Sequence, residues 1–255
     1  MAKRGTVPQR TARQMIREAL LRGLVPGDRL ASEPVLLSYF EVSRASLREA
    51  LRVLSSLGAV EVRSGPGGGS QIAMPRSRVV ASALAMALQF RSATLRTLME
   101  AREAVEPAMS SLAATRRKDQ DLAALEQCLQ RLTDATEAED TRQEKHRFHR
   151  LIATAGGNEV LGLLIPALTW ISTAMEHSDD MWRQCRFVEE RTEILAAIRE
   201  CDSAAAHTRT AELFRRELED LEQHHPQQLA ARVLWPDLDE LLETDLRKDE
   251  ERWKQ

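Results

Sequence analysis

The pattern of apolar and polar positions predicts three helices near the start of the chain. Apolar side chains recur every three or four residues between residues 9 and 23, which is typical of an amphipathic helix. Its expected inward face comprises Ala12, Ile16, Ala19 and Leu20. A short second helix is predicted to begin at the N-cap Ser32 and to run to Tyr39. A third is predicted to begin after Ser43, with an inward stripe formed by Leu47, Ala50, Leu51 and Leu54.

A β-hairpin is expected after these helices. Residues 59–63 alternate between apolar and polar types as a half-buried strand does, and residues 64–70 form a glycine-rich turn. Residues 71–73 are a plausible return strand. Three helices followed by a hairpin predict a winged helix-turn-helix.

The rest of the chain shows helical periodicity without a convincing strand. The expected helices span residues 79–90, 95–117, 120–137, 140–155, 159–177, 180–200 and 203–223. The predicted fold class is therefore mainly α, with an antiparallel bundle of six or seven helices after the winged unit. The domains expected are a DNA-binding unit at 1–75, a linker at 76–78, a helical domain at 79–225 and an acidic, helical tail at 226–255.

Composition agrees with this organisation and argues against membrane, secreted, disulfide-rich and zinc-finger proteins. Hydrophobic residues make up 43% and charged residues 29% of the 255 residues, as in ordinary soluble globular domains. The longest apolar run, residues 79–88, is too short to span a bilayer, so no membrane partner is expected. The basic N-terminus is not followed by the apolar stretch of a secretory signal. Three cysteines without paired spacing favour a reducing cytoplasm over a disulfide framework or zinc finger.

The net charge of −3 conceals two halves of opposite sign. Residues 1–78 hold 13 lysines and arginines against 6 acidic residues, whereas the remainder holds 23 against 33. A basic first domain on an acidic second one indicates that the first meets a polyanion.

The third predicted helix carries the candidate DNA contacts. Arg44, Arg48 and Arg52 recur every four residues opposite the leucine stripe, which places three guanidinium groups on the solvent face. Such a helix fits the major groove, where arginine pairs with guanine and binds phosphate. The alternative is a solvated arginine face that Glu49 partly neutralises.

Residues 26–69 resemble the winged domain of the GntR family of bacterial transcription regulators. The family pattern is met by Pro26, Gly27, Leu30, Ser32, Glu33, Leu36, Val42, Ser43, Arg44, Leu47, Arg48, Glu49, Ala50, Leu51, Leu54 and Gly58. The resemblance implies that Arg44 and Arg48 contact bases and phosphates. It also implies hydroxyl contacts from Ser43 and Ser46 and a wing tip at Gly65. Many relatives carry an arginine where this chain has Pro34, so that contact is expected to be lost or supplied by Arg63.

The second half resembles the FadR-like branch of the family, with its helical FCD domain. The segments that carry this resemblance are LRTLMEAREAVEPAMSSLAA, KHRFHRLIATAGGNEVL and EERTEILAAIRECDSAAA. The resemblance implies an effector-binding domain, which in most members holds a divalent metal through an aspartate and three histidines. The corresponding positions here are Lys145, His149, Arg191 and, near the last, Leu213. One ligand of four remains, so neither metal nor other cofactor is expected. A metal held by His146 and His149 with a further partner is the alternative.

Positive charge at two former ligand positions suggests that this protein recognises an anion directly. We expect Arg102, Lys145 and Arg191, with His149, to bind a small anionic metabolite such as an organic acid or acyl-CoA. The competing interpretation is that Lys145 and Arg191 pair at the surface with Glu144, Glu190 or Glu193.

The sequence thus predicts a metabolite-controlled transcription regulator, most simply a repressor. Its expected partners are double-stranded operator DNA with a palindromic site, the effector, and a second copy of the chain. It would work in the bacterial cytoplasm, at the nucleoid when bound to its operator. One alternative is an architectural DNA-binding dimer without an effector. An enzyme tethered to DNA is the other, although no nucleophile elbow, P-loop or HExxH is present and Cys185 and Cys201 lack an assigned base.

Overall fold

The computed structural model describes residues 5–63, 69–175 and 181–235, and the chain divides into two compact units beside Val79. Each unit has its own hydrophobic core. Among the described helices, none is long and apolar enough to cross a membrane.

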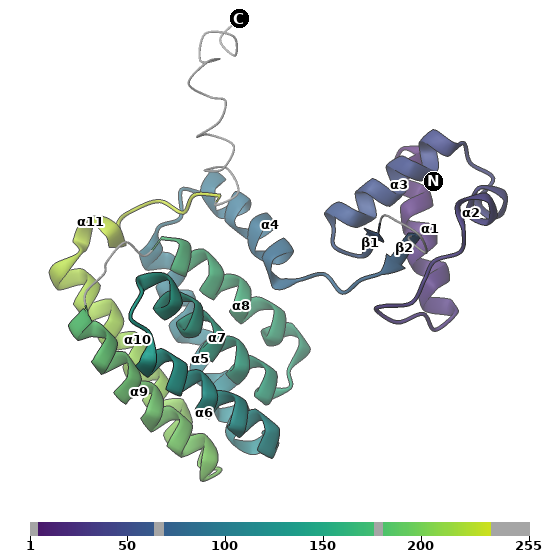
Figure 1. Ribbon diagram of the computed structural model, residues 1–255. Coiled ribbons are helices and arrows are strands. Elements are labelled where there is room, and N and C mark those ends of the chain that lie inside the picture. Colours follow the sequence, from purple (N-terminus) through teal and green to yellow (C-terminus); the bar gives the residue numbers. More distant parts are fainter. Residues whose placement is uncertain (1–4, 64–68, 176–180, 236–255) are drawn as a thin grey trace, which may run out of the picture. The chain divides into compact units, whose positions relative to one another are not determined.

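The first unit has the predicted order of three helices and a hairpin (Figure 1). Its elements are α1 (Val7–Leu21), α2 (Glu33–Phe40), α3 (Arg44–Ser56), β1 (Val60–Arg63) and β2 (Gly69–Ile72). Helix α3 packs against both α1 and β1. The core beneath it comprises Ala12, Met15, Leu36, Leu47, Ala50, Leu54 and Val60. The winged helix-turn-helix expected from the sequence is confirmed.

Local sequence signals set the start of α1. The hydroxyl of Thr6 accepts a hydrogen bond from the backbone N–H of Gln9, whose side chain in turn accepts one from the backbone N–H of Thr6. This reciprocal capping box satisfies two helix-terminal donors. The expected inward face was wrong in one position, because Leu20 is 70% exposed. Met15 is buried instead, since it lies on the same side of the helix as Ala12 and Ala19.

Strands β1 and β2 pair antiparallel, from Val60 opposite Ile72 to Arg63 opposite Gly69. A short segment before α2 joins the hairpin through a bridge between Arg29 and Gln71. The turn at residues 64–68, including the predicted wing tip Gly65, lies outside the described residues.

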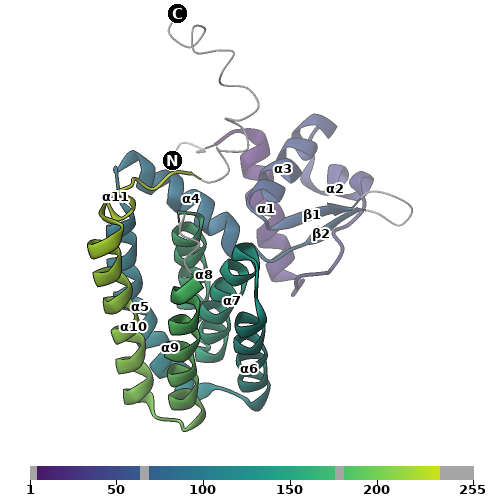
Figure 2. The same cartoon turned by 60° about the vertical axis from the view of Figure 1, so that its left-hand side comes forward.

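The second unit is a bundle of helices (Figure 2). Its elements are α4 (Ser77–Phe90), α5 (Leu95–Arg116), α6 (Asp119–Asp134), α7 (Ala138–Gly156), α8 (Glu159–Ala174), α9 (Met181–Arg199), α10 (Ser203–His224) and the short α11 (Pro226–Leu229). Helix α5 packs against α7, α8, α9 and α10. The predicted all-helical bundle is thereby confirmed.

Two predicted boundaries differ from the structure. Helix α4 begins at Ser77, inside the expected linker at 76–78. Residues 226–235 belong to the helical unit, where Leu229 and Val233 are buried. Beyond α11 the described chain is not helical. The N–H of Val233 donates a hydrogen bond to the carbonyl of Ala93, in the loop before α5. Residues 226–229 form a short helix where the helical tail was expected to begin, residues 230–235 are not helical, and residues 236–255 lie outside the described part.

Candidate functional site

The three arginines of α3 all face solvent. Leu47, Ala50 and Leu54 hold one side of α3 in the core, which leaves Arg44, Arg48 and Arg52 exposed on the other. Because buried and exposed positions are separated in this way, the arginines can approach a DNA groove without disturbing the core.

The acidic neighbours of these arginines differ. Both oxygens of the Glu49 carboxylate accept hydrogen bonds from Arg52, at 2.9 and 3.0 Å. Arg48 lies 4.0 Å from Glu33, and Arg63 on β1 lies 3.6 Å from Glu61. Among the described residues, no acidic side chain pairs with Arg44. The neutralisation by Glu49 that the sequence suggested applies to Arg52.

Ser43 and Ser46 have a structural task at the start of α3. The Ser43 hydroxyl accepts a hydrogen bond from the backbone N–H of Ser46 at 3.2 Å, and it also lies 3.0 Å from the Ser46 hydroxyl. Ser43 is thus the N-cap of the helix. Any contact that it makes to DNA would add to this role.

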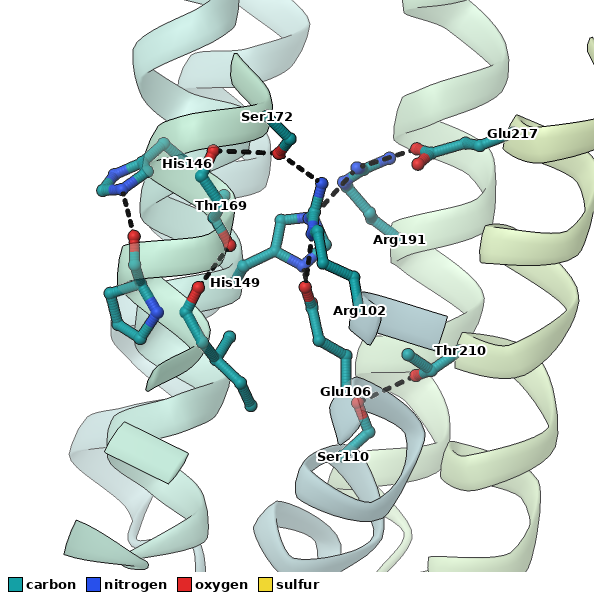
Figure 3. Close-up of polar contacts among 12 residues, drawn as sticks. Arg102, Glu106, Ser110, His146, His149, Thr169, Ser172, Arg191, Thr210 and Glu217 are labelled. Carbon is teal, nitrogen blue, oxygen red and sulfur yellow. Dashed lines mark hydrogen bonds and ion pairs between the residues drawn. The ribbon is translucent and has the colours of Figure 1, made fainter. Parts of the chain in front are cut away.

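A chain of polar side chains, most of them buried, runs through the middle of the helical unit (Figure 3). We call it the buried polar cluster, and its members are Arg102, Glu106, His149, Ser172, Arg191 and Glu217. They come from α5, α7, α8, α9 and α10, which converge at this level of the bundle. Arg102, Glu106, His149 and Arg191 are between 2% and 5% exposed. Three of the four residues expected in the effector site are therefore brought together.

Glu106 holds two members of the buried polar cluster. One oxygen of its carboxylate accepts a hydrogen bond from Nε of Arg102 at 2.7 Å, and the other contacts Nδ1 of His149. Arg102 also donates to the hydroxyl of Ser172 at 2.9 Å. Burial alone would raise the pKa of Glu106, but Arg102 and His149 lower it to about 2. The carboxylate is therefore charged at neutral pH.

His149 lies between a carboxylate and a guanidinium. Arginine only donates hydrogen bonds, so Nε2 of His149 accepts the one from Arg191 at 3.2 Å. Nδ1 must then carry the proton and donate to Glu106. Burial lowers the pKa of His149, with Glu106 opposing and Arg102 and Arg191 reinforcing the shift. A neutral imidazole thus links the two charged pairs.

Arg191 continues the chain of contacts to α10. Its Nη2 donates to Oε1 of Glu217 at 3.4 Å. The surface pairing considered for Arg191 was wrong, because its side chain is only 2% exposed. Phenylalanine rings flank the cations, with Arg102 4.8 Å from the ring centroid of Phe214. Such faces favour a buried guanidinium.

Lys145 and His146 are not among the members of the buried polar cluster. Lys145 is half-buried on α7, one turn before His149, and so lies on the same side of that helix. Nε2 of His146 donates to the carbonyl of Pro166 on α8 at 3.3 Å. Burial lowers the pKa of His146, although this hydrogen bond opposes the shift.

The residues present do not fit the divalent metal that the family resemblance implies. The Nε2 atom of His149 already accepts a hydrogen bond from a guanidinium, and a metal there would meet a positive charge. Leu213 is buried and offers no donor atom. Across the described residues, no three His, Cys, Asp or Glu side chains are grouped so that they could hold a metal.

Sequence reasoning missed Glu106, Ser172 and Glu217. Glu106 stands four residues after Arg102 on one helix, a spacing that by itself indicates an ion pair. Ser172 and Glu217 had no comparable signal, because their contacts join helices 26 to 70 residues apart in the chain.

Comparison with known proteins agrees with both units. The model of bacterial regulatory proteins of the gntR family matches residues 8–68, and the FCD domain model matches residues 97–216. The chain combines a GntR helix-turn-helix with an FCD domain.

Several curated regulators are similar to this chain. The HTH-type transcriptional regulator LutR of Bacillus subtilis is 34% identical over 54% of this chain and 63% of its own length. The HTH-type transcriptional repressor NanR of Cronobacter sakazakii is 30% identical, over 63% of this chain and 62% of its own. This chain therefore covers less than two thirds of either relative.

A solved structure has a similar overall fold. The chain of Streptococcus agalactiae GntR has a TM-score of 0.67 and 26% sequence identity, with 83% of this chain and 99% of that chain covered. GntR-type regulators bind DNA operators and typically act as dimers.

Proposed function

We propose that this protein is a repressor whose operator binding is controlled by a small anionic metabolite. Helix α3 is proposed to enter the major groove of a palindromic operator, with Arg44 and Arg48 at base edges and phosphates. Arg52, Arg63, Ser43 and Ser46 are assigned to the backbone around it, and Gly65 to the wing. Two copies of the chain would read the two half-sites, in the bacterial cytoplasm where the chromosome lies.

The effector is proposed to bind at the buried polar cluster of the FCD domain, with Arg102, Arg191 and His149 as its contacts and Lys145 one turn away. The observation that carries this proposal is the burial of two guanidinium groups, both less than 4% exposed, in the middle of the bundle. Buried ion pairs contribute little stability compared with apolar packing of the same volume. A role in ligand binding therefore explains these buried arginines better than a contribution to the stability of the fold.

The test is an operator-release measurement with the full chain. An operator is first selected from random DNA, and its affinity is measured by fluorescence anisotropy with organic acids, sugar acids and acyl-CoAs. We expect at least one class of anion to weaken binding about tenfold or more, which corresponds to about 1.4 kcal/mol. Arg191→Gln should lose this response while it keeps operator affinity without the anion. The exposed Arg215→Gln is the matched control and should respond as the natural chain does.

The same measurement separates the rival functions. An architectural DNA-binding dimer would bind the operator identically with every anion and would show no ligand-induced rise in melting temperature. A catalytic bundle would convert the anion. Relatives named as transcriptional regulators, and a repressor among them, favour the regulatory reading.

A further inference from the structure

We propose that Glu217 is a built-in competitor of the effector: its carboxylate occupies the place on Arg191 that a carboxylate of the ligand takes. This inference rests on the proposed function, and it assigns the ligand to the carboxylates. It also makes binding an exchange, in which the ligand's carboxylate displaces Glu217 from the guanidinium.

Glu217 differs from the other charged members of the buried polar cluster in its exposure to solvent. Its side chain is 17% exposed, whereas those of Arg102, Glu106, His149 and Arg191 are between 2% and 6% exposed. Glu217 is therefore the most exposed of these charged groups, and its contact is to the nearly inaccessible Arg191. An entering anion would reach Arg191 at this point, and Glu217 is the acidic group that it would have to replace.

The two carboxylates of the cluster are held with different strength. Glu106 contacts both Arg102 and His149, at 2.7 Å from the arginine nitrogen, and is fully enclosed. Glu217 accepts from Arg191 at 3.4 Å. Charge-assisted hydrogen bonds are ordinarily about 2.7–2.9 Å long, so this contact is a weak one. Glu106 is thus a fixed part of the cluster, and Glu217 is the exchangeable part.

Charge balance gives the reason for an exchange. Among the contacts of the described residues, Arg102 is paired with Glu106 and Arg191 with Glu217, while His149 is neutral. If an anion bound while Glu217 stayed in place, the cluster would hold one unpaired negative charge away from water, which is unfavourable. Replacement of one carboxylate by another keeps the balance. A planar ligand carboxylate can also bind the guanidinium through two parallel hydrogen bonds, where Glu217 makes one described contact.

Exchange also links the ligand to helix packing. Glu217 lies on α10 and Arg191 on α9, and the same two helices are joined by the pair of Glu190 with Arg216 at 3.4 Å. Departure of Glu217 removes one of these contacts between α9 and α10. The ligand thereby changes how α10 is held in the bundle.

Calorimetric titration of the full chain with acetate, lactate, succinate and citrate tests the proposal, and acetamide serves as the uncharged probe. In Glu217→Gln the competitor has lost its charge, so at least one of these carboxylates should bind on the order of tenfold tighter than in the natural chain. Glu217→Asp keeps the charge but shortens the side chain by one methylene, so it should also bind tighter. Glu219→Gln, an exposed site on the same helix, should change nothing.

The outcomes separate the exchange from the proposed function. If the natural chain binds a carboxylate and neither Glu217 variant binds it more tightly, the exchange is overturned while an anion-responsive regulator stands. Tighter binding by Glu217→Gln without any gain in Glu217→Asp would mean simple charge repulsion and would also overturn the exchange. If none of the four carboxylates binds to any of the chains, the proposed effector site fails, and the exchange with it.

Discussion

At the scale of single residues, arginines on one helix face differ in what they offer to DNA. The guanidinium of Arg52 is held by both oxygens of Glu49, whereas no acidic side chain among the described residues pairs with Arg44. An arginine that must first leave an ion pair gains less when it binds phosphate or guanine. Equal spacing along α3 therefore does not mean equal contributions.

Arg44→Ala is expected to lower affinity for a selected operator by about 1–3 kcal/mol, as for the loss of a major-groove contact. Arg48→Ala should have an effect of the same size, and Arg52→Ala a smaller one. Fluorescence anisotropy at fixed salt measures all three. Arg13→Ala on α1 is the control, and it should weaken binding to all sequences alike. Full affinity in Arg44→Ala would contradict the placement of α3 in the groove.

The buried histidines make stability depend on pH. Burial lowers the pKa of both His149 and His146 in the folded chain, whereas in the unfolded chain they titrate near 6.5. The unfolded state thus binds more protons below pH 7, and folding stability present above 6.5 is lost as the pH falls. Glu106, with its pKa of about 2, remains charged throughout this range.

Urea unfolding at pH 7.5 and 5.5 should accordingly show a lower free energy of unfolding at pH 5.5. Each histidine can contribute up to about 1.4 kcal/mol per pH unit. His149→Gln removes one such group, so the difference between the two pH values should shrink. The exposed His207→Gln should leave the difference unchanged. A slope that is identical in His149→Gln and the natural chain would show that His149 is not buried in its neutral form.

At the scale of elements, α5 and α7 are in close contact at Gly156. A Cβ atom added there would lie 2.5 Å from the sulfur of Met109 and 3.1 Å from its carbonyl oxygen. The first distance is shorter than real Cβ contacts and the second is tighter than most of them, so a side chain at this position would require Met109 to move. Glycine here serves the packing of the bundle.

Gly156→Ala is expected to destabilise the helical unit by about 1–3 kcal/mol, as overpacking of a close contact does. Gly162→Ala provides the matched control on α8, where an added Cβ meets nothing within 4 Å. That change should be neutral or stabilise the chain by up to about 1 kcal/mol, because alanine favours the helix. Thermal unfolding followed by circular dichroism distinguishes them. Equal melting temperatures of the two variants would contradict the close approach.

At the scale of the whole molecule, we expect the chain to form a dimer. A single winged domain makes few contacts, so operator affinity calls for two domains on one site. The helical unit holds most of the apolar helix surface, including Phe90, which is 88% exposed. We therefore expect residues 77–255 to be dimeric and residues 1–76 monomeric in light scattering at micromolar concentration. A monomeric helical fragment would assign the dimer contact elsewhere.

The sequence by itself determined the elements of this protein and their order. Helix periodicity with N-caps such as Ser43, and a hairpin pattern near Val60, are local signals, because each depends on neighbours a few residues away. The same locality explains the errors. Leu20 fitted the helical spacing but lies off the buried face of α1. Val233 repeats the spacing of Leu229, yet its backbone pairs with a loop 140 residues earlier in the chain.

The tertiary structure alone decided how the charges are paired. Arg102, His149 and Arg191 were singled out from the sequence. The sequence did not indicate which acidic side chains pair with them. Glu217 reaches Arg191 only because α9 and α10 pack side by side, and Ser172 meets Arg102 only across α5 and α8. Desolvation and ion pairing depend on three-dimensional distance and burial, which spacing along a chain does not specify.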